Sequence, residues 1–216
     1  MKLLKRLPFE LVCKYSLGRN ICYFIGLVTC TTLIACSEHL PYEDDADTLG
    51  HSAPTPATIA ANQLSYKNLP IEDQEDFNNA RRGLIAQDAE LSIHHKDGQK
   101  IWSMPDYSFV NGKAADSVNP SLWRQETLNN IHGLFKVSEG IYQLRGYDLA
   151  NMSIIEGDSG WIIVDPLTAK ETSAKALEFA RQHLGRKPIK AVIFTHSHVD
   201  HFGGIEGILE NISVAE

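Results

Sequence analysis

Four side chains that bind metal ions in proteins lie within a stretch of six residues: His196, His198, Asp200 and His201. His196 and His198 are two residues apart, so in an extended chain their side chains project to the same side. Three imidazoles and one carboxylate this close together are difficult to direct at one tetrahedral ion, but two ions about 3.5–4 Å apart can share them. The spacing therefore predicts a dinuclear site, whereas a lone His-x-His pair is more often a chance arrangement at the surface.

The ligand types also indicate which metal such a site would take. Nitrogen and oxygen ligands without sulfur suit zinc, with iron or manganese as alternatives. All cysteines lie in the first 36 residues, so none downstream is available as a thiolate ligand or for an intrachain disulfide. We therefore expect two zinc ions held by histidines and carboxylates.

The residues on either side of the motif predict a strand and a helix. Residues 190–195 (KAVIFT) are almost entirely apolar, which predicts a short strand covered on both faces. Gly203 and Gly204 precede a final helical segment, and their lack of side chains lets the loop fold tightly. Loops at the carboxyl ends of strands are where α/β proteins place their sites.

The segments before this strand complete an α/β pattern. Residues 134–166 predict four antiparallel strands, the last of which ends at Asp165-Pro166 because proline cannot continue the ladder. Residues 170–184 predict an amphipathic helix that stops at Gly185. The order of strands, helix, buried strand, loop and helix predicts an α/β sandwich.

Three elements are expected upstream of the strands. Residues 71–87 open with acidic residues and carry apolar residues at helical spacing, which predicts a helix. Asp97-Gly98 lies between two β-prone runs and predicts a hairpin. Asn119-Pro120 predicts an N-cap and first helical residue, for a helix that ends near residue 130.

The N-terminal residues are typical of an export signal. Residues 1–35 are basic and end in a 15-residue apolar run, which is short for a membrane span. Leu33-Ile34-Ala35-Cys36 resembles a bacterial lipoprotein box, in which Cys36 would become the lipidated first residue, with a plain signal peptide or an uncleaved anchor as alternatives. Ser37 favours the outer membrane by analogy with lipoprotein sorting, so we expect an exported, periplasm-facing lipoprotein. Residues 36–62 predict a flexible tether and residues 63–216 the folded domain.

The charge balance argues against a nucleic-acid partner. The whole chain carries a net charge of −7, and its first 35 residues carry +4, which leaves −11 on the remainder. Phosphate backbones require a basic surface, which this remainder lacks overall. An anionic substrate would therefore need a local basic pocket.

The His-x-His-x-Asp-His string resembles the signature of the metallo-β-lactamase superfamily. In that family the histidines matching His196 and His198 hold one metal, and the residues matching Asp200 and His201 help to hold the second. An aspartate at the end of an earlier strand supports the metal loop, and Asp165 matches it, with a simple strand-ending Asp-Pro turn as the alternative. The resemblance implies the first half of the superfamily's αββα sandwich, here preceded by a helix and a β-hairpin.

A narrower resemblance, to the alkyl sulfatase branch, runs from about residue 69 to the end. It implies zinc-dependent hydrolysis of primary alkyl sulfate esters such as dodecyl sulfate, with cleavage of the carbon–oxygen bond favoured. The partner would be a small amphipathic sulfate ester, and the full-length protein would form a homodimer. The segments that carry the resemblance are NPSLWRQ (119–125), HGLFKV (132–137), YQLRGYDLANMSII (142–155), VDPL (164–167) and THSHVDHFGG (195–204).

The resemblance extends over about the first third of that branch's length. The family's remaining metal ligands lie downstream of the motif, so each ion would keep two ligands from this chain, fewer than the three of a catalytic zinc site. We expect the 216-residue chain alone to bind metal weakly and to turn over little substrate. Alternatives are a lactam, thioester or phosphodiester hydrolase of the same fold, or an inactive truncated lipoprotein.

Several other polar residues are expected to have ordinary structural roles. Paired histidines beside an Asp-Gly turn are usually solvated, and a histidine near a helix end usually interacts with the helix dipole. An arginine on a strand could meet a sulfate group but is more often a surface or ion-pair residue. The residues set aside in this way are His39, His51, His94, His95, His132, His183 and Arg145.

Overall fold

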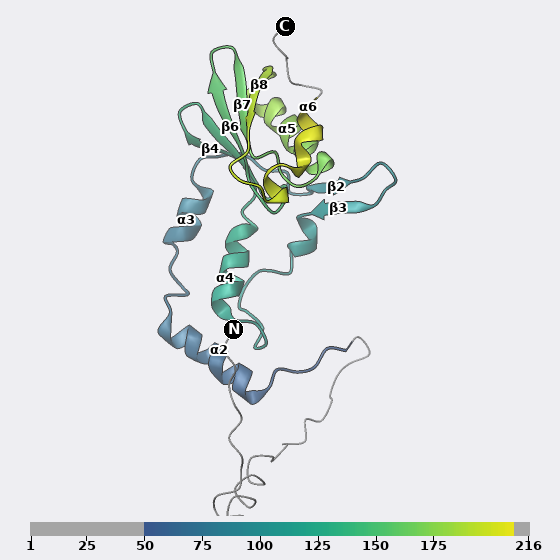
Figure 1. Ribbon diagram of the computed structural model, residues 1–216. Helices are drawn as coiled ribbons and strands as arrows, with labels where there is room; N and C mark the ends of the chain where they lie inside the picture. Colours follow the sequence, from purple (N-terminus) through teal and green to yellow (C-terminus); the bar gives the residue numbers. More distant parts are fainter. Residues whose placement is uncertain (1–49, 210–216) are drawn as a thin grey trace, which may run out of the picture. The chain divides into compact units, whose positions relative to one another are not determined.

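A computed structural model describes residues 50–209, and its central feature is a mixed six-stranded sheet (Figure 1). The strand order is β1-β4-β5-β6-β7-β8, antiparallel throughout except for the parallel pair β7–β8. This sheet confirms the four predicted antiparallel strands. The strands are β1 (Leu84–Ala86), β4 (Gly133–Ser138), β5 (Ile141–Arg145), β6 (Met152–Gly157), β7 (Gly160–Val164) and β8 (Ile189–Ile193).

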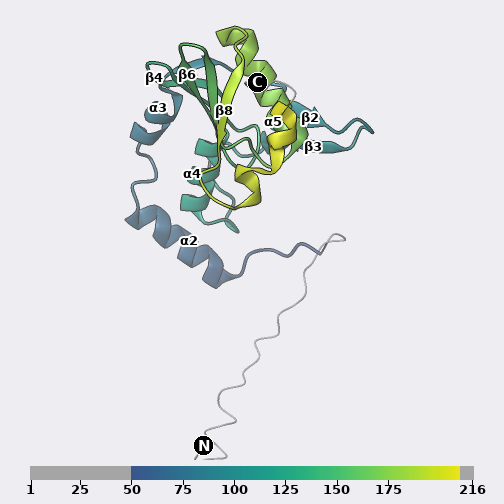
Figure 2. The ribbon, with the colours of Figure 1, turned by 45° about the horizontal axis from the view of Figure 1, so that its top comes forward.

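The helix α5 (Lys170–Leu184) connects the two parallel strands and covers one face of the sheet (Figures 1 and 2). A parallel pair requires such a crossover, because a tight hairpin can only join antiparallel strands. The helix ends at Gly185, whose positive φ of 84° suits glycine. Its bounds agree with those predicted from the amphipathic pattern.

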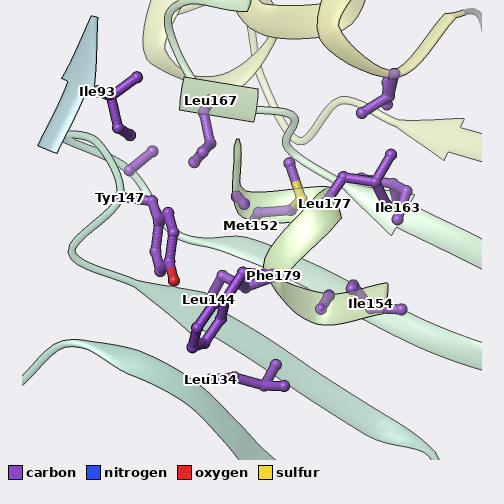
Figure 3. Close-up of a cluster of buried hydrophobic side chains, with 14 of the residues drawn as sticks. Ile93, Leu134, Leu144, Tyr147, Met152, Ile154, Ile163, Leu167, Leu177 and Phe179 are labelled. Atoms are coloured by element: carbon purple, nitrogen blue, oxygen red, sulfur yellow. The ribbon is translucent and has the colours of Figure 1, made fainter. Parts of the chain in front are cut away.

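The hydrophobic core lies between α5 and the sheet, and Figure 3 shows its side chains. Trp161 and Ile163 of β7 are fully buried there, opposite Leu177 of the helix. Alternation along β7 places Ile162 and Val164 on the other face of the sheet, where both are only partly buried. The core therefore lies on one side of the sheet.

The predicted hairpin and the predicted helix at residue 120 are both present. Strands β2 (Ser92–His94) and β3 (Lys100–Ser103) pair around the Asp97-Gly98 turn, and both contact α5. Helix α4 (Pro120–Asn129) begins at the expected N-cap, where the Asn119 side chain accepts a hydrogen bond of 2.9 Å from the Ser121 N–H. A 3₁₀ turn, η1 (Pro105–Tyr107), lies between the hairpin and this helix.

The predicted helix over residues 71–87 is wrong in its second half. Helix α3 covers only Glu75–Arg81, and the chain then forms the short strand β1, which pairs with β4. Gly83 adopts a φ of 77°, and a Cβ there would lie 2.1 Å from the Lys136 carbonyl oxygen. This close approach to β4 diverts the chain from helix to strand.

The predicted tether also extends too far along the chain. Helix α2 (Pro56–Asn68) begins inside residues 36–62, because Thr55 caps its first turn and Pro56 suits the first helical position. The Asn62 side chain donates a hydrogen bond to the Asp116 carbonyl, and the Tyr66 hydroxyl accepts one from the Ala114 N–H. The signal peptide, Cys36 and the start of the tether lie outside the described residues.

Strand β8 differs from the expectation of cover on both faces. Ile193 and the following Phe194 remain 47% and 48% exposed, whereas Ile189 at the start of the strand is buried. Within residues 50–209, β8 has β7 as its neighbour and ends the sheet on that side. Its apolar composition therefore does not correspond to burial among these residues.

None of the helices in this part of the chain is both long enough and apolar enough to span a bilayer.

The cap of α4 provides a test of how this helix is held. Replacing Asn119 with Ala should lower the free energy of unfolding by about 1 kcal/mol, because the Ser121 N–H loses its acceptor. Urea unfolding followed by circular dichroism measures the change. Gln182→Ala, at an exposed position in α5, is the control and should stay within about 0.5 kcal/mol of the parent. Equal stabilities of the two variants would contradict this role for Asn119.

Candidate metal centre

The predicted metal motif lies in the loop that follows β8, beside the loop that follows β7. The parallel pairing aligns Val164 with Ile193, and the Asp165 N–H donates to the Ile193 carbonyl at 2.9 Å. Because both strands end at the same edge of the sheet, Asp165 and Thr195 become neighbours across 30 residues of sequence. After Thr195 the chain passes through two short 3₁₀ turns, η2 (Val199–His201) and η3 (Gly203–Ile205), into α6 (Glu206–Leu209).

The carboxylate of Asp165 binds this loop through three hydrogen bonds. Its Oδ1 accepts from the Thr195 N–H at 2.8 Å. Its Oδ2 accepts from the Thr195 hydroxyl at 2.7 Å and contacts His201 Nδ1 at 2.8 Å. Asp165 is 7% exposed, so these bonds replace most of its contact with water. The residue thus contacts the metal motif, as the superfamily resemblance implies, and also ends β7.

These contacts determine the charge of Asp165. Burial alone would raise its pKa, but the hydrogen bonds from His201 and from the Thr195 N–H and hydroxyl outweigh that effect. The pKa therefore lies below the usual value for aspartate, and the group is a carboxylate at neutral pH. A carboxylate can only accept hydrogen bonds, so His201 must carry its proton on Nδ1. The Nε2 of neutral His201 is then free to bind a metal.

A similar argument applies to His196. The Thr195 hydroxyl donates to Asp165, so its lone pairs remain available to accept from His196 Nδ1, 3.0 Å away. This contact leaves Nε2 of His196 as the metal-binding nitrogen. The rings of His196 and His201 are 4.0 Å apart, and those of His196 and His198 are 4.7 Å apart. Asp200 lies beside them, with its Oδ2 3.3 Å from His201 Nε2.

Close backbone packing holds the end of the metal loop, at Gly203 and Gly204, against the loop after β7. A Cβ on Gly203 would lie 2.4 Å from the Thr168 carbonyl oxygen, and one on Gly204 would lie 2.2 Å from the Pro166 carbonyl oxygen. The Gly204 N–H donates to the Leu167 carbonyl at 2.8 Å. The glycines thus let the metal loop pack directly on the loop after β7.

The side chains fit zinc in their chemistry but do not converge on one point. His196 and His198 are exposed, and Asp200 and His201 are partly buried, so ions can reach all four. As they stand, no three His, Cys, Asp or Glu side chains between residues 50 and 209 are arranged to hold a metal ion. Two ions would therefore each have fewer protein ligands from these residues than a catalytic zinc site takes. Metal binding stays a prediction, and we expect it to be weak.

Asp148 is a buried carboxylate whose role the sequence did not reveal beyond a turn. Its Oδ1 accepts from the Leu149 N–H and the Thr168 hydroxyl, both at 2.6 Å. Its Oδ2 accepts from the Thr168 N–H at 3.1 Å and from the Thr172 hydroxyl. These bonds tie the β5–β6 loop to the residues that follow Asp165. The only sequence signal was the pair of threonines at the start of α5, which is too common to identify such a contact.

His132, His95 and His183 contact residues outside the metal motif. His132 is buried and contacts the carbonyls of Asn130 and Asp88 at 2.9 Å. His94 is exposed, whereas His95 pairs with Asp97 at 2.9 Å. His183 packs on the Phe179 ring at 4.6 Å. His39 lies outside the described residues.

Comparison with known proteins identifies relatives of this arrangement. Residues 145–216 match the family described as the metallo-beta-lactamase superfamily. An (R)-specific secondary-alkylsulfatase of Pseudomonas sp. is 50% identical over 170 residues, which cover 78% of this chain and 26% of that protein. A linear primary-alkylsulfatase of Pseudomonas sp. is 48% identical over 162 residues, 74% of this chain and 24% of the relative. An alkyl/aryl-sulfatase of Saccharomyces cerevisiae is 44% identical over 160 residues, 74% of this chain and 25% of the relative.

A solved structure shows the same relationship in three dimensions. The stereoselective inverting sec-alkylsulfatase Pisa1 from Pseudomonas sp. matches with a TM-score of 0.71 and 51% sequence identity, over 76% of this chain and 26% of that chain. The α/β arrangement is therefore the metallo-β-lactamase fold of the alkylsulfatases over part of the chain. The chain spans about a quarter of the length of the relatives that it matches.

The Asp165 contacts predict a measurable loss of stability on substitution. Asp165→Asn keeps the size of the side chain and tolerates its φ of 55°, but its amide cannot accept all three hydrogen bonds. We expect the free energy of unfolding to fall by about 1–3 kcal/mol at neutral pH, as measured in urea. Asp158→Asn, in the exposed β6–β7 turn, is the control and should change little.

The difference in unfolding free energy between the parent and Asp165→Asn should also depend on pH. The folded pKa of Asp165 is lowered, so its contribution is complete above the ordinary aspartate pKa of 3.8 and is lost as the pH falls through the folded value. The stability difference between the parent and Asp165→Asn should therefore shrink as the pH falls through the folded pKa of Asp165. A difference that persists undiminished at the lowest pH at which the parent still folds would contradict the assigned charge.

Proposed function

We propose that these residues form part of a zinc-dependent sulfatase that hydrolyses primary alkyl sulfate esters such as dodecyl sulfate. The observation that carries the proposal is the cluster of His196, His198 and His201 at the ends of two parallel strands, where Asp165 binds Thr195 and His201. The 48% identity to a linear primary-alkylsulfatase supports the choice of substrate. The relatives named above are all sulfatases, which favours this reading over a lactam, thioester or phosphodiester hydrolase.

Hydrolysis of secondary alkyl sulfates is a second candidate. The (R)-specific secondary-alkylsulfatase is 50% identical to the chain, and that value is too close to 48% to separate the two substrates. Primary and secondary esters differ in crowding at the carbon that carries the oxygen. The shape of the substrate pocket should therefore determine which ester is hydrolysed faster, and a panel of primary and secondary alkyl sulfates tests this preference directly.

The residues of this chain would orient the metal site. His196 and His198 would hold one zinc ion, and Asp200 and His201 would help to hold the second. Asp165 and Thr195 would keep the rings of His196 and His201 turned so that each presents Nε2. When bound, the two ions supply Lewis acidity for a hydrolytic water and for the oxygens of the sulfate group. The four ligands that would hold the ions all lie on one short loop.

An activity assay tests the proposed function. The longest reading frame that contains these residues is loaded with zinc and given dodecyl sulfate, a secondary octyl sulfate, an aryl sulfate and a cephalosporin, and the released sulfate or opened lactam is measured. We expect sulfate release from the alkyl esters, and a loss of about a hundredfold or more in kcat/KM for His198→Ala, because a metal ligand is removed. His94→Ala, on the exposed hairpin, should retain the parent rate. Hydrolysis of the cephalosporin alone, or an unchanged rate in His198→Ala, would contradict the proposal.

We further propose that the protein is an exported lipoprotein, anchored to the outer membrane through Cys36 with its folded domain facing the periplasm. The basic leader, the short apolar run and the Leu33-Ile34-Ala35-Cys36 box support this proposal.

Labelling with radioactive palmitate in a bacterial host with two membranes tests the anchor. Cys36→Ser should abolish incorporation of the label and move the protein out of the outer-membrane fraction, because the acylated thiol is lost. Cys30→Ser, six residues earlier in the apolar run, is the matched control and should still be labelled. Equal labelling of both variants would contradict the assignment of Cys36.

A further inference from the structure

A cavity of about 400 Å³ lies beside the Asp148 loop and outside the metal motif. Its walls come from α3, β3 and η1, the carboxyl end of α4, and the chain from the end of β5 to residue 151. Asp148 lies in the wall and binds Thr168, which follows Asp165 by three residues. The cavity and the metal loop therefore share the loop after β7 as common support. The side chains that decide its chemistry are Trp102, Met104, Tyr107, Glu126, Arg145 and Leu149.

Arg145 is a partly buried cation in this wall, and within residues 50–209 it forms no ion pair with a carboxylate. Its Nε donates to the Gln143 side chain at 2.7 Å, and one terminal nitrogen donates to the Ala80 carbonyl at 3.3 Å. The guanidinium also stacks over the Phe135 ring at 4.3 Å. Burial lowers the pKa of its guanidinium.

The geometry of Arg145 leaves donors for a ligand. A guanidinium has five N–H groups in a fixed fork, and the contacts above engage two of them. Of the two roles expected for Arg145, a surface residue or an ion-pair residue, the ion pair is not found within the described residues, and the side chain is partly exposed. A planar cation with free donors is well suited to bind the oxygens of a sulfate group.

Two carboxylates in the wall limit which anions can bind. Asp148 already accepts four hydrogen bonds from the loops, so its charge is largely compensated within the protein. Glu126 is partly buried, and the bond it accepts, from Asn129, is long at 3.4 Å. Its charge opposes that of Arg145, so a small inorganic anion would gain little here. Binding would need a second, apolar contribution.

The rest of the wall offers that contribution. The Trp102 indole N–H donates to the Gly146 carbonyl at 2.7 Å, which fixes the ring, and the Tyr107 ring lies 6.0 Å from it. Met104 also lines the cavity and is 8% exposed, whereas Leu149 is 77% exposed. Together they form the apolar part of a wall that also includes Asn129, Asn130 and Asn151.

We propose that this cavity binds an amphipathic sulfate ester, with its sulfate group on Arg145 and its carbon chain against Trp102, Met104 and Leu149. The choice of a sulfate ester rests on the proposed function, whereas the pairing of an anionic group with an apolar chain rests on the cavity itself. The site is linked to the loop after β7 through the hydrogen bonds of Asp148, and its lining includes none of the metal ligands.

Nuclear magnetic resonance of the tryptophan side chains tests the proposal without metal. The ¹⁵N-labelled full chain is titrated with hexyl sulfate below its micelle concentration, and separately with inorganic sulfate, in the presence of a chelator. The Trp102 indole signal should shift and saturate with hexyl sulfate, whereas that of Trp161, buried in the core, should not move. Inorganic sulfate should bind about tenfold or more weakly, because it lacks the apolar contact. Equal affinities for the two probes would overturn the proposal.

Two substitutions with opposite expected effects on the affinity for hexyl sulfate make the test specific. Arg145→Gln should weaken hexyl sulfate binding by about tenfold or more, because a charge-assisted hydrogen bond is lost. Glu126→Gln should strengthen it, because a like charge is removed from the wall. Arg186→Gln, whose guanidinium pairs with Glu178 at the surface, is the control and should bind as the parent does. Should Arg145→Gln fail to fold, Glu126→Gln still decides, since unchanged or weaker binding in that variant would contradict the proposal.

The Trp102 titration and the sulfate-release assay can fail independently of each other. An absence of sulfate release by the zinc-loaded protein would contradict the enzymatic assignment but would leave the Trp102 titration unaffected. A Trp102 signal that does not respond to hexyl sulfate would overturn the cavity assignment even if the loaded protein hydrolyses dodecyl sulfate.

Discussion

The parallel pairing of β7 with β8 is the constraint on which the arrangement of the site depends. It brings the ends of two strands together across a long crossover, so that one carboxylate, Asp165, reaches both the backbone and the side chain of Thr195. From there a third hydrogen bond reaches His201, and the ring of His196 lies against it. An antiparallel pair would place the two loops at opposite edges of the sheet. The helix α5 is thus necessary to the site although it contributes no ligand to it.

At its β7–β8 end the sheet is packed on one face, and among the described residues the site that follows these strands is open. Trp161, Ile163 and Leu177 fill the space under α5, and their burial holds the strands in register. On the other face Ile162 and Val164 are only partly covered, and Ile193 is about half exposed. The histidines extend from the end of this least covered strand. The metal loop then continues into η3 and α6, which pack on α5, so the helix that covers the core also supports the metal loop.

Local sequence signals predicted the elements whose ends are set by local chemistry. Asn119-Pro120, Asp97-Gly98 and Gly185 each fix a cap or turn within a few residues, and the structure contains those elements with nearly the predicted bounds. The helix predicted over residues 71–87 is shorter in the structure because the chain at Gly83 packs closely against the Lys136 carbonyl of β4, which is 53 residues away in sequence. Helix α2 was missed because its composition resembles a linker and its contacts are made with residues near 115.

The parts of the site differ in the same way, because some depend on local sequence and others on contacts between distant segments. The ligand motif is visible in the sequence because all its members lie on one loop, and Asp165 was identified through a family resemblance. Asp148 and the Arg145 cavity depend on contacts between segments 20 to 65 residues apart, which no local pattern encodes. Asp148 contacts the cavity on one side and Thr168 on the other, next to the carbonyls on which Gly203 and Gly204 pack. Asp148 therefore links the wall of the cavity, through its hydrogen bonds to Thr168, to the loop on which the metal loop packs.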